Sequence, residues 1–117
     1  MISSWLKRVG PAMPIIENAP GRLVLKSGST TLTLDMQVGK ATLQRRFLLW
    51  SRKPIEALLS DIAEFTIDTA VDRASGVEIC HTMVVLRSGV GWAFPAENKA
   101  DAQANATLMR NFLDRRQ

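Results

Sequence analysis

The chain has 117 residues, with one cysteine (Cys80) and one histidine (His81). This length predicts a single domain with one hydrophobic core. A lone cysteine excludes an internal disulfide, and a lone histidine excludes a histidine-rich metal site. The composition is 46% hydrophobic and 22% charged, with a mean hydropathy of +0.01, which is typical of a folded globular protein rather than a disordered one.

The formal net charge of +4 is unevenly distributed along the chain. Residues 1–60 hold nine basic and three acidic side chains, and residues 61–117 hold six basic and eight acidic ones. A basic half can attract phosphates or anionic lipids. It can also complement an acidic half of the same fold, or have no consequence at all; in a domain this small, complementarity or indifference is the commoner case.

No segment of the sequence is apolar enough to span a membrane. The longest apolar runs are Phe47–Trp50 and Met83–Leu86, whereas a transmembrane helix needs about 20 apolar residues. No apolar stretch of the signal-peptide type follows Lys7 and Arg8. We therefore expect a cytoplasmic protein, with a membrane-peripheral location as the alternative.

The first residues of the chain have helical spacing, because Ile2, Trp5, Leu6 and Val9 fall on one face of a helix. Two interpretations stay open: a short helix that binds a membrane surface or a partner, and an arm that packs on its own domain. Prolines and glycines over residues 10–21 predict an extended connector. We therefore assign residues 1–21 to an arm and connector, and residues 22–117 to the domain.

From Arg22 onwards the apolar residues alternate with polar ones, which predicts β-strands. The turn at Val38-Gly39-Lys40 joins two such strands into a hairpin. Residues 55–60 fit either a strand or one helical turn. The remaining strands are expected over residues 62–67, 77–87 and 91–94, of which 77–87 is the strongest because it is rich in Val, Ile and Thr.

After Pro95 the period becomes helical. Asn98 is the expected N-cap, with Asp101 in the first turn. The expected apolar face consists of residues four apart and their flanking neighbours, namely Ala100, Ala104, Leu108 and Phe112, flanked by Ala106, Met109 and Leu113. One helix of this length can close an open face of a curved sheet, which predicts an α+β roll or a partly open barrel.

This layout resembles the bacterial pleckstrin-homology-like (PH-like) domains. The resemblance depends on the order and spacing of the hairpin at 31–46, the segments 59–65 and 83–89, and the closing helix ending at 108–113. It implies an α+β, mainly β fold, a roll of about seven antiparallel strands in two nearly orthogonal sheets. One C-terminal α-helix caps that roll. It also implies a binding or assembly role rather than catalysis.

Members of that family that bind phosphoinositides use a spaced set of three basic residues. Lys40 and Arg45 match the first two positions, but Phe47 occupies the third. Arg46 is adjacent instead, on the opposite face of the strand. The turn at 38–40 is also short for an inositol phosphate, so we expect no specific inositide site.

Nothing in the sequence predicts catalysis, a metal or a cofactor. Cys80 and His81 are neighbours on a strand, so their side chains point to opposite faces and cannot act as a nucleophile and its base. We expect a buried thiol and a surface or groove histidine. Glu56, Asp61 and Glu64 lack metal-ligand spacing, and the glycines form no phosphate-binding loop.

Nucleic acid is the least favoured partner, because it requires a clustered basic face with exposed aromatic residues. Residues 45–53 come nearest to this pattern. Arg45, however, shares its register with Leu43 and Phe47, so we expect it to be partly buried.

Protein association is the preferred interpretation. Three tryptophans are many for a small roll, and an exposed one near Arg52 would be an interface anchor; the alternative is that all three pack internally. If the strand over 77–87 lies at a sheet edge, it could pair with another chain. We therefore predict a non-enzymatic binding or scaffolding module that contacts a protein partner or forms a homo-oligomer, with weak anionic membrane contact as the alternative. The candidate interaction surface is Trp5, Lys7, Arg8, Lys40, Arg46, Trp50, Arg52 and Lys53.

Overall fold

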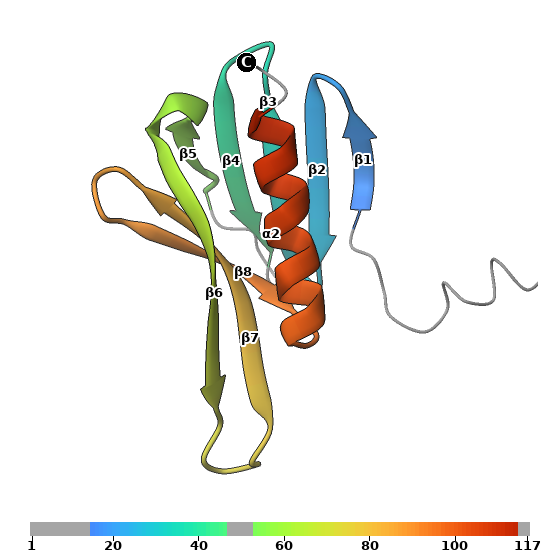
Figure 1. Cartoon of the computed structure of the whole chain (residues 1–117), viewed down its shortest axis with the longest axis vertical. Coiled ribbons are helices and arrows are strands. Elements are labelled where there is room, and N and C mark those ends of the chain that lie inside the picture. The colour runs from blue at the N-terminus through green and yellow to red at the C-terminus, as the bar shows by residue number, and fades with distance from the viewer. Residues whose placement is uncertain (1–14, 47–52, 115–117) are drawn as a thin grey trace, which may run out of the picture.

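The computed structural model describes residues 15–46 and 53–114. Within these residues the fold is mainly β, with two antiparallel sheets and one C-terminal helix, as the sequence predicts (Figure 1). Eight strands are present in the described part of the chain, so the expected count of about seven is low by one. The additional strand precedes Arg22.

The first sheet has five strands in chain order. Strands β2 to β4 have buried leucines on one face, and all residues on the other face are polar except the buried Val24 of β2. This is close to the alternation expected of a sheet with one solvent-facing side. Gly28 and Gly39 form the tight turns between them with φ of 60° and 71°, a region that glycine enters without strain. The strands are β1 (Ile15–Ala19), β2 (Arg22–Ser27), β3 (Thr30–Asp35), β4 (Lys40–Arg45) and β5 (Ile55–Leu58).

The expected connector over residues 10–21 is wrong for residues 15–19, which form β1. This strand pairs antiparallel with β2, from Ile15 opposite Leu25 to Ala19 opposite Arg22. Proline ends strands readily but leaves the five residues between Pro14 and Pro20 free to donate backbone hydrogen bonds. The folded body therefore includes residues that we expected to lie outside it.

The second sheet has three strands, β6 (Ile62–Val71), β7 (Glu78–Leu86) and β8 (Gly91–Ala96), again in chain order. One 3₁₀ turn, η1 (Leu59–Asp61), joins β5 to β6. Residues 55–60 thus contain both a strand and a turn of helix, the two structures that the sequence left open.

Strand β7 is the central strand of its sheet, with β6 on one side and β8 on the other. The expectation that it could pair with another chain as an edge strand is therefore wrong. The reason is that a tight turn lies at each end of β7. Residues 72–77 connect it to β6, and residues 87–90 connect it to β8. The exposed edges of this sheet belong to β6 and β8, and to β7 only at Glu78 and Ile79, which β8 does not reach.

Helix α2 (Lys99–Asp114) follows β8. Asn98 caps it as predicted, because its Oδ1 accepts a hydrogen bond from the backbone N–H of Asp101 at 2.8 Å. The predicted apolar face is confirmed at Ala106, Met109 and Phe112, which are buried. It is wrong in part, because Ala100 is exposed and Ala104 and Leu108 are only half-buried. Asn105 is polar but lies on the buried face of the helix, so the pattern of apolar residues alone does not reveal that face. The buried face is Ala102, Asn105, Ala106, Met109 and Phe112.

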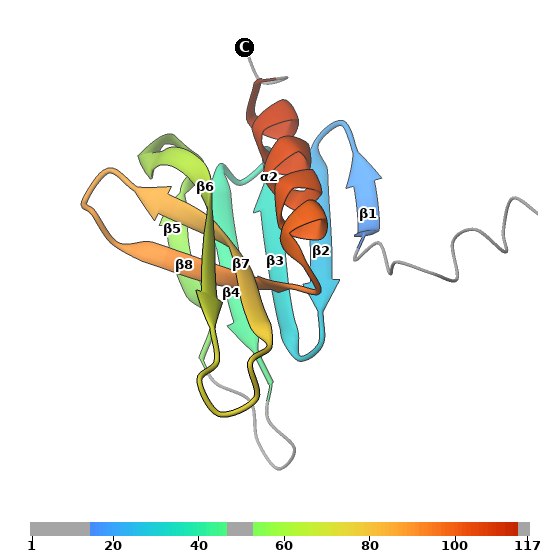
Figure 2. The same cartoon turned by 60° about the horizontal axis from the view of Figure 1, so that its bottom comes forward.

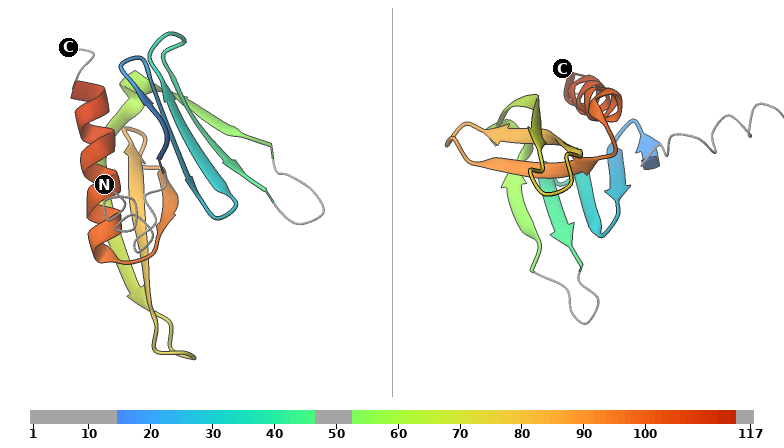
Figure 3. Two further views of the ribbon diagram at one scale, coloured as in Figure 1. Left: turned by 90° about the vertical axis from the view of Figure 1, so that its right-hand side faces the viewer. Right: turned by 90° about the horizontal axis from the view of Figure 1, so that it is seen from below.

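The core lies between the two sheets and the helix. Figures 2 and 3 show β7 and β8 crossing the five-stranded sheet rather than running along its strands, with α2 alongside. Leu25, Leu34, Phe94 and Phe112 are almost completely buried in one continuous cluster. Trp92 is 4% exposed and belongs to this core, whereas Trp5 and Trp50 lie outside the described residues.

Candidate functional site

The predicted interaction surface does not form one patch among the described residues. Lys40 begins β4 and Arg46 directly follows its end, so they lie at opposite ends of the strand, about 20 Å apart at 3.3 Å per residue. Lys40 forms an ion pair with Glu56, with 3.7 Å between Nζ and Oε1. Lys53 is exposed just before β5. The other members lie outside the described residues: Trp5, Lys7, Arg8, Trp50 and Arg52.

Arg46 instead lies beside Lys26, a residue that the sequence analysis missed. Both line a hollow of about 340 Å³ on the outer face of the five-stranded sheet. The register could have revealed this, because Lys26 lies opposite Thr31, and Thr31 lies opposite Gln44 on the next strand. We call this hollow the basic hollow; its lining residues are Lys26, Gly28, Ser29, Thr31, Gln44 and Arg46.

Arg45 is exposed, so its expected partial burial is wrong. It is the last residue of β4, beyond the buried Leu43, and its guanidinium reaches across to the other sheet. There Nη2 donates a hydrogen bond of 3.3 Å to the backbone oxygen of Ala93 in β8. Arg45 therefore joins the two sheets rather than contributing to the basic hollow.

A larger hollow of about 500 Å³ lies at one end of the molecule, and we call it the end groove. Three segments that are far apart in sequence form its walls: the β2–β3 turn, the start of β7, and the end of β8 with the residue that follows it. The charged side chains in this lining are the carboxylates of Glu78 and Glu97. The lining residues are Ser27, Gly28, Ser29, Thr30, Glu78, Ile79, Cys80, His81, Pro95, Ala96 and Glu97.

Cys80 and His81 both line the end groove but do not form a catalytic pair. Cys80 is 2% exposed, which confirms the expected buried thiol, and His81 is half-buried. Burial raises the pKa of the Cys80 thiol, and the Glu78 carboxylate raises this pKa further, while Lys99 opposes the shift. The thiol therefore stays protonated at neutral pH, which is the unreactive form.

The hairpin of β6 and β7 projects beyond the rest of the molecule (Figure 1). Strand β8 pairs only with Cys80 to Val85 of β7, so the residues before Cys80 have only β6 as a neighbour. We define residues 68–79 as the distal ribbon; all of them are exposed except Asp72, which is half-exposed. Three of its side chains are exposed aliphatics, with 64% exposure at Val71, 59% at Val77 and 44% at Ile79.

The tip of the distal ribbon is an ordered turn. One Asp72 carboxylate oxygen accepts a hydrogen bond from the backbone N–H of Ala74 at 3.2 Å, and the other accepts one from the Ser75 hydroxyl at 2.9 Å. The backbone N–H of Asp72 also donates to the oxygen of Val77 at 2.9 Å. These bonds hold the two exposed valines on either side of the turn in defined positions.

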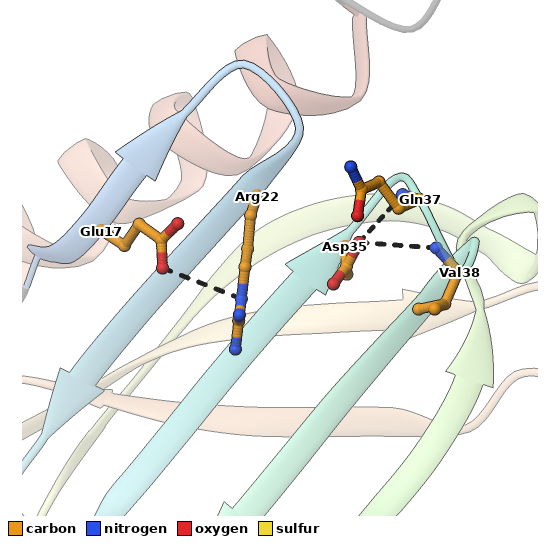
Figure 4. A network of polar contacts seen from close by, with 5 residues as sticks. All are labelled: Glu17, Arg22, Asp35, Gln37 and Val38. Carbon is orange, nitrogen blue, oxygen red and sulfur yellow. Dashed lines mark hydrogen bonds and ion pairs between the residues drawn. The ribbon is translucent and has the colours of Figure 1, made fainter.

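A polar cluster at the opposite end of the five-stranded sheet is structural (Figure 4). Asp35 accepts hydrogen bonds from the backbone N–H groups of Gln37 and Val38, at 2.8 and 3.4 Å, which closes the β3–β4 turn. Arg22 lies 3.8 Å from Glu17 on the neighbouring strand. These contacts use local partners and leave no arrangement of free groups that indicates chemistry.

Within residues 15–46 and 53–114, no three His, Cys, Asp or Glu side chains gather as metal ligands. In the same residues, no helix has the length and apolar character needed to cross a membrane.

No protein-family model, curated protein or solved structure matches this chain. The site must therefore be interpreted from its own geometry.

Proposed function

We propose that this protein is a non-enzymatic binding module that acts through protein–protein contacts, and that self-association is one form of this activity. The observation that supports the proposal best is the distal ribbon, with its three exposed aliphatic side chains on a projecting, ordered hairpin. Burying one such side chain contributes about 1.5–3 kcal/mol. Aliphatic groups held clear of the body on a rigid hairpin are suited to a partner surface.

The outer edge of β6 adds a second means of association. Strand β6 has ten residues and pairs with β7 on one side only. Arg110 of α2 donates a hydrogen bond of 3.0 Å from Nη2 to the Phe65 oxygen, so among the described residues the free edge of β6 is the part from Thr66 to Val71. The irregularity between Ile62 and Glu64 is confined to its first residues and leaves Phe65 to Val71 regular. A strand from a second chain can add to such an edge by backbone hydrogen bonds.

The resemblance of the layout to PH-like domains supports the same class of function. The described residues form two antiparallel sheets and a C-terminal helix, and the resemblance implies this same layout. It favours binding and assembly over catalysis, and the protonated, buried Cys80 thiol is in keeping with this.

Light scattering after size-exclusion chromatography, over a range of protein concentrations, tests the self-association. We expect the mean mass to rise with concentration, and Val71→Lys to weaken association by about tenfold, because each 1.4 kcal/mol changes the equilibrium constant tenfold. Val38→Lys is the matched control, since Val38 is 63% exposed at the far end of the sheet against 64% for Val71.

A monomer at every concentration would reject self-association. An equal loss of association in Val38→Lys and Val71→Lys would reject the distal ribbon as the interface.

A specific observation also favours the second candidate, a peripheral membrane-binding module. Lys26 and Arg46 share the basic hollow, which no acidic side chain among the described residues lines. Lys53 precedes β5 at the same end of the sheet, because β4 and β5 are antiparallel. These cations would attract the phosphates of anionic lipids, by about 1 kcal/mol for each basic residue near the surface.

Co-sedimentation with phosphatidylserine-containing vesicles at low salt tests this second function. Replacing both Lys26 and Arg46 by Gln is expected to reduce the bound fraction, because two cations facing the lipid are lost. Lys40→Gln is the control, since Lys40 is paired with Glu56 at the other end of β4. Equal sedimentation with neutral and anionic vesicles, or no sedimentation with either, would contradict the proposal.

A further inference from the structure

The end groove has an acidic and partly apolar lining. Among the described residues, two charged side chains line it, and both are negative. Glu78 is the first residue of β7, and Glu97 directly follows the end of β8. Ile79, which is 44% exposed, and Pro95 add apolar surface beside them. A complementary occupant is therefore a peptide segment that is basic and also has apolar side chains.

Residues 1–14 join the sheet close to this groove. They lead into Ile15, which lies opposite Leu25, and Ser27, two residues further along β2, already lines the groove. At about 3.3 Å per residue along a strand and about 4.8 Å between strands, Ile15 is roughly 8 Å from Ser27. The segment is thus tethered at the rim of the groove.

The composition of residues 1–14 matches the lining. The segment contains Lys7 and Arg8 and no acidic residue, together with the apolar residues Ile2, Trp5, Leu6 and Val9. Lys7 precedes Ile15 by eight residues, which reach up to about 26 Å when extended. This reach is about three times the distance from Ile15 to the groove wall at Ser27, so the tether is long enough for Lys7 to enter the groove.

We propose that residues 1–14 bind in the end groove of their own molecule, with Lys7 and Arg8 facing Glu78 and Glu97. The apolar side chains of the segment then cover Ile79 and Pro95. A short tether favours this intramolecular contact, because it gives the segment an effective concentration in the groove of the order of millimolar. The inference goes beyond the proposed function and does not depend on it: of the three exposed aliphatic side chains of the distal ribbon it covers Ile79 alone, and Val71 and Val77 do not line the groove.

Zero-length carbodiimide cross-linking of the full chain, followed by peptide mass spectrometry, tests the contact. The reagent joins a lysine amine directly to a carboxylate that it touches. We expect a link from Lys7 to Glu78 or Glu97. The Lys40–Glu56 pair, at 3.7 Å, is the internal reference, because it should be linked in the same sample.

Mixing ¹⁵N-labelled and unlabelled protein before the reaction distinguishes contacts within one molecule from contacts between molecules. We expect Lys7 links in which both peptides are labelled or both are unlabelled. The yield should also fall at about 1 M salt, where the Debye length is about 3 Å.

Two results would overturn the proposal: recovery of the Lys40–Glu56 link without any Lys7 link to the groove, or Lys7 links that are mainly of mixed label. Amide NMR shifts give an independent measurement that needs no reagent. Replacing Lys7 and Arg8 together by Glu should shift the amides of residues 78–81 and leave those of the β3–β4 turn, 36–39, unchanged; unshifted groove amides would equally reject the contact. Light scattering reports on self-association separately, so the two proposals can fail independently.

Discussion

Asn105 is the residue least well accommodated by its surroundings. It is 1% exposed on the buried face of α2, and neither its Oδ1 nor its Nδ2 has a hydrogen-bond partner among the described residues. A buried amide without a partner destabilises the fold by about 1–3 kcal/mol. One turn earlier, Asp101 Oδ2 is also buried and has no hydrogen-bond partner among the described residues. The part of Asp101 that takes part in the helix cap is its backbone N–H.

Replacing Asn105 by Leu should therefore stabilise the protein. We expect the free energy of unfolding to rise by about 1–3 kcal/mol, because the unpaired amide is replaced by an apolar group of similar size. Urea denaturation followed by circular dichroism measures the change. Asn111→Leu, at an exposed position of the same helix, should change the stability much less. A loss of stability in Asn105→Leu would mean that the amide has a partner after all.

Cys80 makes stability depend on pH in the alkaline range. Its thiol pKa is raised above the ordinary value of 9.0, first by burial and then by Glu78. The folded state therefore holds the proton at pH values where the unfolded state releases it, so this contribution is complete below the unfolded pKa and is lost as pH rises through the folded one. The free energy of unfolding should fall above about pH 9.

Urea unfolding at pH 7 and pH 10 measures this effect, with Cys80→Ala as the control variant. The drop between the two pH values should be smaller in the variant, because it lacks the ionising group. An equal drop in both proteins would assign the alkaline sensitivity to other groups.

At the scale of elements, the sequence predicts the regular strands well. Strand β3 alternates leucine and threonine, and this period of two marks a strand with one buried face. Strand β1 escaped detection because five residues between prolines show no clear period. The buried face of α2 was predicted only in part, because Asn105, a polar residue, occupies the buried stripe.

The β3–β4 turn is the element whose geometry depends most on one residue. Gly39 has φ of 71°, and its oxygen also accepts the backbone N–H of Leu59 at 2.9 Å, which attaches η1 to the turn. Gly39→Ala should cost about 1–2 kcal/mol, because side chains disfavour this backbone region. Thermal unfolding measures it. Gly21→Ala is the control, since Gly21 has no positive φ and open space around it; equal effects would exclude backbone strain as the cause.

At the scale of the whole molecule, the two charge halves of the sequence correspond to the two layers of the fold. The basic half forms the five-stranded sheet, and the acidic half forms the three-stranded sheet and α2. Both ion pairs found among the described residues, Glu17–Arg22 and Lys40–Glu56, lie within the five-stranded sheet. Of the two alternatives left open, complementarity or indifference, no ion pair between the layers in this part of the chain supports complementarity.

The candidate sites were harder to predict than the fold because their walls come from distant segments. The end groove joins residues near 28, 79 and 96, and only the packing of the two sheets brings them together. Lys40 and Arg46 are close in sequence, but a strand is extended and separates them. Their closeness in sequence therefore suggested one basic surface, whereas the structure places Lys40 and Arg46 at opposite ends of β4.

The projecting β6–β7 hairpin has a practical consequence for how the chain can be divided. Arg73 stands at its exposed tip, between strands that are joined by a continuous register from Glu64–Val85 to Val71–Glu78. A cut after Arg73 removes no core residue and leaves two pieces, each with part of the same core. The hairpin tip is thus the natural place to split this protein into complementing fragments whose reunion rebuilds the two-sheet core.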